Sequence, residues 1–337
     1  MQDGRQEIHT LEMHTGGEPV RIVTEGYPPV PGATILAKRR HALETLDDLR
    51  RLLMFEPRGH FDMYGVIPVE PDLPEADLAV LFMHNEGYST MCGHAVIALG
   101  RYAVDRGLVA AQEPETEVRI QCPCGLVTAF VEVRDGRSGR VRFTSVPAFA
   151  FALERGIETR TYGPVTLDIG YGGAFYALAP AEQLGLDVRT SRTRDLVDAA
   201  AEITAAVKAQ VALEHPDDAD LAFLYGTILT DGRDAAPSAP SANICVFAES
   251  QVDRSPTGSG VTARIAVQHR RGQTALGESR SFESVTGAVF TGRALAETRV
   301  GRFPAVAVEV AGEAHYCGEA RFFLEPGDRI GQGFLLR

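Results

Sequence analysis

The sequence predicts an α/β protein of two similar domains that face each other, and three observations lead to this fold class. The chain has 337 residues, which is long for a single hydrophobic core and favours two domains. Twice it runs from an apolar strand pattern through a small Gly-containing turn, at residues 91–94 and 253–260, into an apolar helical pattern. The remaining segments have the lengths and patterns of strands. The two helix N-termini are therefore expected at a cleft between the domains.

Composition and charge exclude several classes of protein. The formal net charge is −12, which leaves no basic excess for nucleic acid or for an anionic membrane. No apolar run reaches the ~18 residues that a membrane span needs, and residues 1–7 lack a signal core, so a cytoplasmic protein is expected. Five cysteines without framework spacing favour reduced thiols over disulfides.

The first domain begins with strands. Residues 8–36 alternate as strands do, with a turn at residues 14–19, and leucines at helical spacing predict a surface helix over residues 45–55. Residues 58–66 lead into a further strand; His60 and Asp62 there are interpreted as turn residues, with a functional role as the alternative. Residues 78–83 form a continuously apolar run that predicts a buried strand.

The first key turn precedes a helix that is apolar on every side, over residues 95–104, with Gly107 as its αL stop. Strands are expected at residues 117–121, 126–133 and 140–144. Cys122 and Cys124 lie between two of them, and a turn is favoured over a metal site because no further ligands have suitable spacing. The pattern changes at residues 147–159, where we place the domain boundary.

The second domain repeats these features. A strand is expected at residues 165–169, an amphipathic helix at 196–211 and a buried strand at 243–248. The second key turn follows, and residues 261–267 begin another enclosed helix that ends near Gly272. After this helix, strands are expected at residues 282–290, 304–310 and 320–324.

The first key turn carries a candidate catalytic thiol, Cys92. A helix N-terminus favours an anion, so Cys92 is expected to have a lowered pKa and to exist as a thiolate near neutral pH. It could act as a nucleophile with His94 as its base, as in a Cys/His hydrolase, or as a base toward an acidic C–H group. The base role additionally needs a group that holds the developing negative charge.

The second key turn can supply that group. The backbone N–H groups of Gly258 and Ser259, with those of Gly93 and His94, could hold one substrate carboxylate from both helix ends. Asp253 could bind a ring ammonium. A phosphate-binding loop is the weaker interpretation, because Gly258-Ser259-Gly260 has no Lys-Ser/Thr after it.

At these residues the chain resembles the proline racemase family. The matching blocks, in chain order, are residues 14–19, 58–63, 91–94, 171–176, 253–256 and 287–292. The resemblance implies that no cofactor is needed and that two cysteines on opposite faces of the substrate exchange the Cα proton. It also implies a fold like that of diaminopimelate epimerase, with each domain a β-barrel-like sheet around a central helix. The expected domains are residues 1–152 with 325–337, and residues 153–324; a homodimer is possible.

The sequence departs from the racemase pattern at Thr257, which stands where the second cysteine is expected. A threonine hydroxyl has no accessible anion at neutral pH, so racemisation should fail. The Cys-plus-Thr pattern resembles instead the trans-3-hydroxy-L-proline dehydratases of the same family. In that substrate the hydroxyl and the Cα hydrogen share one ring face, so Cys92 alone could remove the proton and protonate the departing hydroxyl, with His94 and Asp253 at the ring nitrogen. The alternatives are a proline racemase or hydroxyproline 2-epimerase, and a non-catalytic binder of a cyclic amino acid.

Overall fold

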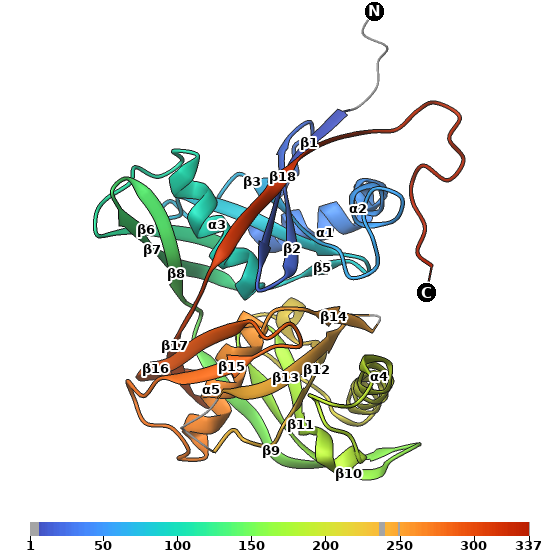
Figure 1. The fold of residues 1–337 in the computed structure, drawn as a ribbon, viewed down its shortest axis with the longest axis vertical. Helices are drawn as coiled ribbons and strands as arrows, with labels where there is room; N and C mark the ends of the chain where they lie inside the picture. Colours follow the sequence, from blue (N-terminus) through green and yellow to red (C-terminus); the bar gives the residue numbers. More distant parts are fainter. Residues whose placement is uncertain (1–6, 236–239, 249, 337) are drawn as a thin grey trace, which may run out of the picture.

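The computed structural model describes residues 7–235, 240–248 and 250–336, and it consists of two halves stacked on each other (Figure 1). The first half contains residues 7–144 and 314–323, and the second half contains residues 148–312. The strands of the first half are β1 (Glu7–Thr15), β2 (Glu18–Glu25), β3 (Tyr64–Val69), β4 (Leu78–His84), β5 (Tyr88–Ser89), β6 (Glu115–Cys122), β7 (Gly125–Arg134), β8 (Arg137–Thr144) and β18 (Ala314–Phe323). Its helices are α1 (Ile35–Thr45), α2 (Asp47–Met54) and α3 (Gly93–Asp105).

The second half has a similar inventory. Its strands are β9 (Ala148–Thr159), β10 (Gly163–Tyr171), β11 (Phe175–Pro180), β12 (Leu224–Thr230), β13 (Ser241–Phe247), β14 (Gln251–Asp253), β15 (Arg280–Glu283), β16 (Val289–Val300) and β17 (Phe303–Gly312). Its helices are α4 (Thr193–Gln210) and α5 (Gly258–Arg270), with short 3₁₀ turns at Ala181–Leu184 and Ala219–Leu221.

The two halves share one strand topology. In the first half, β1 and β2 are antiparallel, β2 and β3 are parallel, and β4 pairs in parallel with β6. In the second half, β10 and β11 are antiparallel, β11 and β12 are parallel, and β13 pairs in parallel with β15. The short strands β5 and β14 precede α3 and α5 at equivalent points. The predicted pair of similar domains is therefore confirmed as a repeat of topology.

Each half wraps its sheet around one central helix. Helix α3 packs against β1, β7, β8 and β18, whereas α5 packs against β9, β10, β16 and β17. Residues 95–99 of α3 are fully buried, as expected for a helix that is apolar on every side. Helix α5 carries one buried cation, Arg264, which donates hydrogen bonds to Asn243 Oδ1 (2.7 Å) and Ser241 Oγ (2.6 Å) and pairs with Asp234. The barrel-like sheet with a central helix is thus present twice.

Strand pairing also joins the halves. Residues 309–312 of β17 pair with residues 141–144 of β8, and β18 then pairs with β1 along its whole length. In Figure 1 this red segment runs from the lower half to the upper one. The two helix N-termini meet where the halves face each other, because α3 contacts α5.

Most predicted elements are confirmed, including the strand over residues 78–83, the enclosed helices and the helix over 196–211. Two were wrong. Residues 282–290 are not one strand, because a turn at residues 284–288 separates β15 from β16. Residues 35–36 begin helix α1 and do not continue a strand, since Thr34 caps that helix by accepting the N–H of Ala37 at 3.2 Å.

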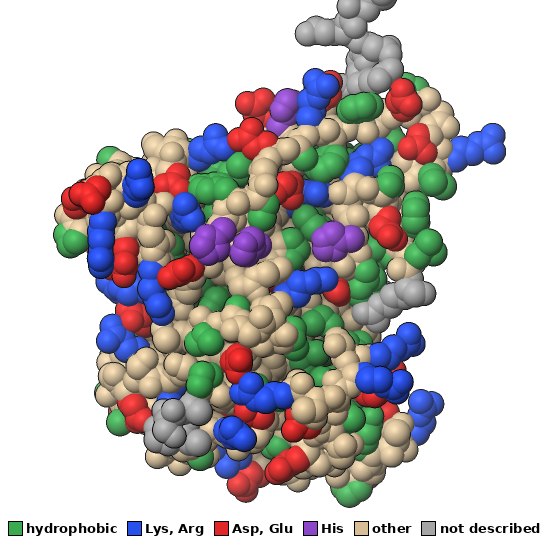
Figure 2. Space-filling view, in the orientation of Figure 1, with side chains coloured by type: hydrophobic (Ala, Val, Ile, Leu, Met, Phe, Trp, Pro, Cys, Tyr) green, Lys and Arg blue, Asp and Glu red, His purple; other side chains and the backbone are tan. Residues whose placement is uncertain are grey.

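None of the described helices combines the length and the apolar character that crossing a membrane requires. Basic and acidic side chains are intermixed over the face that Figure 2 shows.

Candidate active site

A small cavity lies between the N-termini of α3 and α5. Its lining comes from both halves of the chain and consists of Tyr64, Met91, Cys92, Gly93, His94, Tyr176, Tyr225, Phe247, Asp253, Thr257, Gly258 and Ser259. All seven site residues that the sequence predicted are among them. Cys92 is 4% exposed and Thr257 is 3% exposed, so the cavity is closed to bulk solvent.

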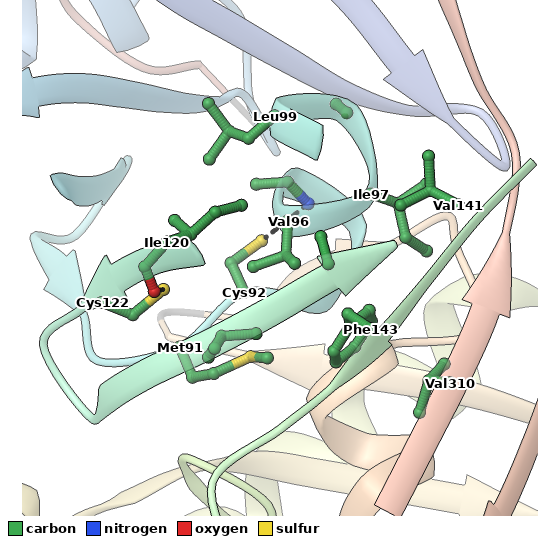
Figure 3. Close-up of a cluster of buried hydrophobic side chains, with 14 of the residues drawn as sticks. Met91, Cys92, Val96, Ile97, Leu99, Ile120, Cys122, Val141, Phe143 and Val310 are labelled. Atoms are coloured by element: carbon green, nitrogen blue, oxygen red, sulfur yellow. Dashed lines mark hydrogen bonds between the residues drawn. The ribbon is translucent and has the colours of Figure 1, made fainter. Parts of the chain in front are cut away.

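Cys92 is the N-cap residue of α3. Its backbone is extended (φ −146°, ψ 103°), and its sulfur accepts a hydrogen bond from the N–H of Ala95 at 3.4 Å (Figure 3). The thiol thus takes the place that a serine or aspartate oxygen usually holds at a helix N-terminus. The first-turn N–H groups of Gly93 and His94 have no acceptor within the helix, and they are available to an anion in the cavity.

Thr257 is the N-cap residue of α5, at the point equivalent to Cys92. Its backbone is left-handed (φ 67°, ψ 89°), which is a strained conformation for a β-branched residue. Its side chain does not cap the helix, and its buried hydroxyl lies beside the thiol of Cys245. Its N–H donates to Ser255 Oγ at 3.1 Å. The two helix ends are therefore equivalent in topology and different in local geometry.

His94 lies beside the thiol. Its Nδ1 is 3.2 Å and its Nε2 is 3.6 Å from Cys92 Sγ. Burial lowers the pKa of His94, and the nearby Asp253 carboxylate offsets only part of this lowering. Burial raises the pKa of Cys92 well above its ordinary value; the N–H of Ala95 opposes this, and Asp253 and Glu18 add to it. The expected lowering of the Cys92 pKa is wrong for the closed cavity, because desolvation outweighs the helix end.

Asp253 stands at the end of β14, next to the second turn. It is 5% exposed, and its Oδ1 accepts the N–H of Ser255 at 2.8 Å. This short bond shapes the turn that leads to Thr257. A second carboxyl group, that of Glu18, lies near Asp253. Burial is the main cause that raises the pKa of Glu18, and the negative charge of Asp253 raises it further. A cation in the cavity would relieve this concentration of negative charge.

Four aromatic wall residues were not predicted as site residues. The Tyr176 hydroxyl is 2.7 Å from Ser259 Oγ, and the Tyr64 ring meets the His94 ring edge-on with centroids 4.8 Å apart. Tyr225 and Phe247 stack with centroids 5.2 Å apart. Two of them could be found from the sequence, because they belong to or adjoin segments that match the proline racemase family. Tyr176 is the last residue of the segment 171–176, and Tyr64 directly follows the segment 58–63. Tyr225 and Phe247 come from β12 and β13 and carry no local motif.

Cys122 and Cys124 lie at the hairpin between β6 and β7, where Cys122 pairs with Gly125, so the turn interpretation is confirmed. Among the described residues, no group of three or more His, Cys, Asp or Glu side chains is arranged to hold a metal ion.

Comparison of the sequence with known proteins finds named relatives of this chain. A trans-L-3-hydroxyproline dehydratase of Xenopus tropicalis is 61% identical over 332 residues, which cover 98% of this chain and 95% of the relative. A 3-hydroxyproline 2-epimerase of Burkholderia multivorans is 47% identical, over 98% of this chain and 99% of the relative.

The fold has solved counterparts as well. The crystal structure of a hydroxyproline epimerase from Agrobacterium vitis, with bound trans-4-hydroxy-L-proline, matches with a TM-score of 0.92 and 29% identity, covering 100% of this chain and 97% of that one. The model of the family described as proline racemase matches residues 10–335. With the paired helix ends, the shared fold and this match over nearly the whole length, the chain belongs to the proline racemase family.

Proposed function

We propose that this chain is a hydro-lyase that converts trans-3-hydroxy-L-proline to pyrroline-2-carboxylate without a cofactor. The observation that carries the proposal is the pairing of one thiol, Cys92, with one hydroxyl, Thr257, at equivalent helix ends facing a single cavity. Only one face of the bound substrate then meets an acid/base group. The relative that is 61% identical bears the name of this activity.

Substrate binding would use both helix ends. The first-turn N–H groups of Gly93, His94, Gly258 and Ser259 would hold the carboxylate from two sides and would stabilise the enolate-like charge that forms on it. The ring ammonium would lie between His94 and Asp253. Its positive charge next to Asp253 would lower the cost of a nearby thiolate, which burial otherwise makes unfavourable. A neutral His94 imidazole, which burial favours, would accept a hydrogen bond from the ring ammonium.

The elimination balances with a single group. The Cys92 thiolate removes the Cα proton and becomes a thiol, and the electrons of the C–H bond move into the carboxylate-stabilised carbanion. The carbanion then expels the 3-hydroxyl as the ring double bond forms, while the thiol returns the proton to the departing oxygen. The products are water and Δ2-pyrroline-2-carboxylate, and the thiolate is restored. Tautomerisation in solution gives the Δ1 imine.

The test is the product spectrum in D2O. The protein is incubated separately with trans-3-hydroxy-L-proline and with L-proline, and products are followed by mass spectrometry and NMR. We expect pyrroline-2-carboxylate from the first substrate and no deuterated D-proline from the second. Deuterated D-proline without loss of water from the hydroxylated substrate would overturn the proposal in favour of a racemase or epimerase. Cys92→Ser should abolish turnover, whereas Cys317→Ser, at an exposed thiol, should not.

The remaining expectations are also proposals. The five cysteines form no disulfide, which supports a reducing compartment such as the cytoplasm. A homodimer is expected from the family resemblance, and light scattering tests it. Two domains meeting at residues 147–159 are supported by the repeated topology, but the pairing of β18 with β1 favours a return to the first domain at Ala314, earlier than the expected residue 325.

A further inference from the structure

Three charged residues outside the cavity lining connect the two halves beside the site. Glu18 begins β2 and Asp62 precedes β3, both in the first half, while Arg254 follows β14 in the second half. The Arg254 guanidinium lies between the two carboxylates, with Nη1 3.5 Å from Glu18 Oε2 and Nη2 3.3 Å from Asp62 Oδ2. We call these three residues the Arg254 clamp.

Glu18 holds the backbone of Arg254 as well as its side chain. The Arg254 N–H donates a hydrogen bond to Glu18 Oε2 at 2.7 Å, the shortest contact of the clamp. Glu18 is fully buried, and its other oxygen, Oε1, has no hydrogen-bond partner among the described residues. A buried carboxyl group is costly to place in a protein, and here its direct contacts are with Arg254 across the interface between halves.

Asp62 holds the preceding part of the same segment. Its Oδ1 accepts the N–H of Val252 at 3.0 Å, in addition to the contact of Oδ2 with Arg254. Asp62 has a left-handed backbone (φ 71°), and its own N–H donates to Asn85 Oδ1 at 2.8 Å. Asn85 Oδ1 also accepts the Gln251 side-chain amide at 2.8 Å. Residues 251, 252 and 254 are thus each bonded to the first half.

Asp253 lies between these anchored residues. Its neighbours Val252 and Arg254 are fixed through their backbone N–H groups by carboxylates of the opposite half, while its own carboxylate lines the cavity. We propose that Glu18 and Asp62 are positioning residues, which grip Arg254 when the two halves close and so fix Asp253 and the Thr257 turn over the substrate. The clamp holds only in the closed arrangement, because its partners come from different halves.

Access to the cavity requires this arrangement to open. Cys92 and Thr257 are almost fully buried, so a substrate or a reagent reaches them only when the halves separate or the walls unfold locally. A group that stabilises the closed form lowers the fraction of time for which Cys92 is reachable. The reactivity of Cys92 therefore reports closure together with ionisation of the thiol, which the Glu18 charge also affects, so Arg254→Gln gives the cleaner comparison. The readout does not depend on knowing the substrate.

The experiment compares the rate at which iodoacetamide modifies Cys92, followed by peptide mass spectrometry, in the wild type and in Glu18→Ala, Glu18→Gln, Asp62→Asn and Arg254→Gln. Glu18→Ala and Arg254→Gln should raise the rate about tenfold or more, since each removes a charge-assisted bond between halves. Glu18→Gln keeps an acceptor for the Arg254 N–H and should stay closer to the wild type than Glu18→Ala. Asp62→Asn should give a smaller rise.

The matched control is Asp168→Asn, which breaks an ion pair with Arg271 (2.7 Å) that lies wholly within the second half. It should leave the Cys92 rate unchanged. An unchanged rate in Arg254→Gln and Glu18→Ala, or an equal rise in Asp168→Asn, would overturn the clamp. If Glu18→Ala does not fold, Asp62→Asn, altered at a partly exposed side chain, decides the question in its place.

The assignment to catalysis rests on the proposed function and has a separate readout. With trans-3-hydroxy-L-proline, Glu18→Ala should lose about tenfold or more in kcat/KM, with Glu18→Gln recovering most of it. If Glu18→Ala shows faster alkylation but a normal kcat/KM, the clamp holds the halves together without positioning Asp253. That result would overturn the positioning role. A wild type that turns over no hydroxyproline isomer would refute the proposed function, while the alkylation result would still decide whether the clamp exists.

Discussion

Gly93 and Gly258 bring the two halves into backbone contact at the first residues of α3 and α5. A Cβ atom added to Gly93 would lie 2.5 Å from the Cα of Gly258, and one added to Gly258 would lie 2.7 Å from the Cα of Gly93. Both distances are shorter than real Cβ contacts, and backbone atoms cannot move aside as side chains can. The two glycines therefore set how closely the helix ends approach one carboxylate.

Gly93→Ala should separate these helix ends. We expect a protein that folds, with stability lowered by about 1–3 kcal/mol from overpacking and kcat/KM lowered by about 10²-fold, because the N–H groups no longer converge. Thermal unfolding and steady-state kinetics measure the two effects. Gly156→Ala is the control, since a Cβ there meets no atom within 4 Å. Wild-type kcat/KM in Gly93→Ala would show that the close approach is not needed.

Thr257→Cys should restore a second acid/base group on the opposite face of the substrate. We expect exchange of the Cα hydrogen of L-proline with solvent and the appearance of D-proline, neither of which the wild type should give. The measurement is deuterium incorporation in D2O followed by chiral separation. Thr257→Ser is the matched control, because it keeps a hydroxyl and should not gain exchange. Absence of exchange in a folded Thr257→Cys would mean that position 257 does not face the Cα.

Thr257→Gly should stabilise the fold. A β-branched residue at φ 67° carries strain of about 1–3 kcal/mol, and glycine adopts this conformation freely. The gain is reduced by the small void that the lost side chain leaves, so we expect a net stabilisation of about 1 kcal/mol by denaturant unfolding. A destabilised Thr257→Gly would indicate that packing of the threonine methyl outweighs its backbone strain.

The Cys92 thiol should ionise late in the substrate-free protein. Because burial raises its pKa, the alkylation rate of Cys92 should still be rising above the ordinary cysteine pKa of ~8.5. Peptide-resolved alkylation from pH 6 to 10, with the denatured chain as reference, gives the comparison. A plateau already near pH 7 would show that the N-terminus of α3 outweighs desolvation after all.

The sequence predicted both helix ends and all seven of their candidate residues, because the signals there are local. Cys92 and Thr257 each stand beside glycines just before an apolar helix, and that pattern is readable without a fold. Tyr225 and Phe247 carry no such signal. They line the cavity because the neighbouring strands β12 and β13 form part of its wall, which is a long-range property of the sheet.

The pKa of Cys92 was predicted in the wrong direction for a similar reason. A helix N-terminus is visible in the sequence, but the depth at which it is buried depends on the opposite half of the chain. The Arg254 clamp was missed likewise, since Glu18 and Arg254 are 236 residues apart. Asp62 was weighed as a turn residue, and its left-handed backbone is consistent with a turn, while its carboxylate contacts became visible only with both halves assembled.

Glu18 gives a final prediction, on stability against pH. Burial raises its pKa well above the ordinary value, Asp253 and Asp62 raise it further, and the N–H and charge of Arg254 oppose them. The folded protein therefore binds a proton at Glu18 more tightly than the unfolded chain does. Between the unfolded pKa of ~4.3 and the folded one, the free energy of unfolding should fall as pH rises, by at most about 1.4 kcal/mol per pH unit from this group.

Glu18→Gln should remove this contribution, because the amide resembles the protonated acid and does not titrate. We expect the stability difference between Glu18→Gln and wild type to grow in favour of the variant from pH 5 to 8, measured by urea unfolding at each pH. Glu25→Gln, at an exposed position at the end of the same strand, should show no such trend. A difference that shrinks with rising pH would mean that Arg254 outweighs burial and lowers the pKa of Glu18 in the folded protein.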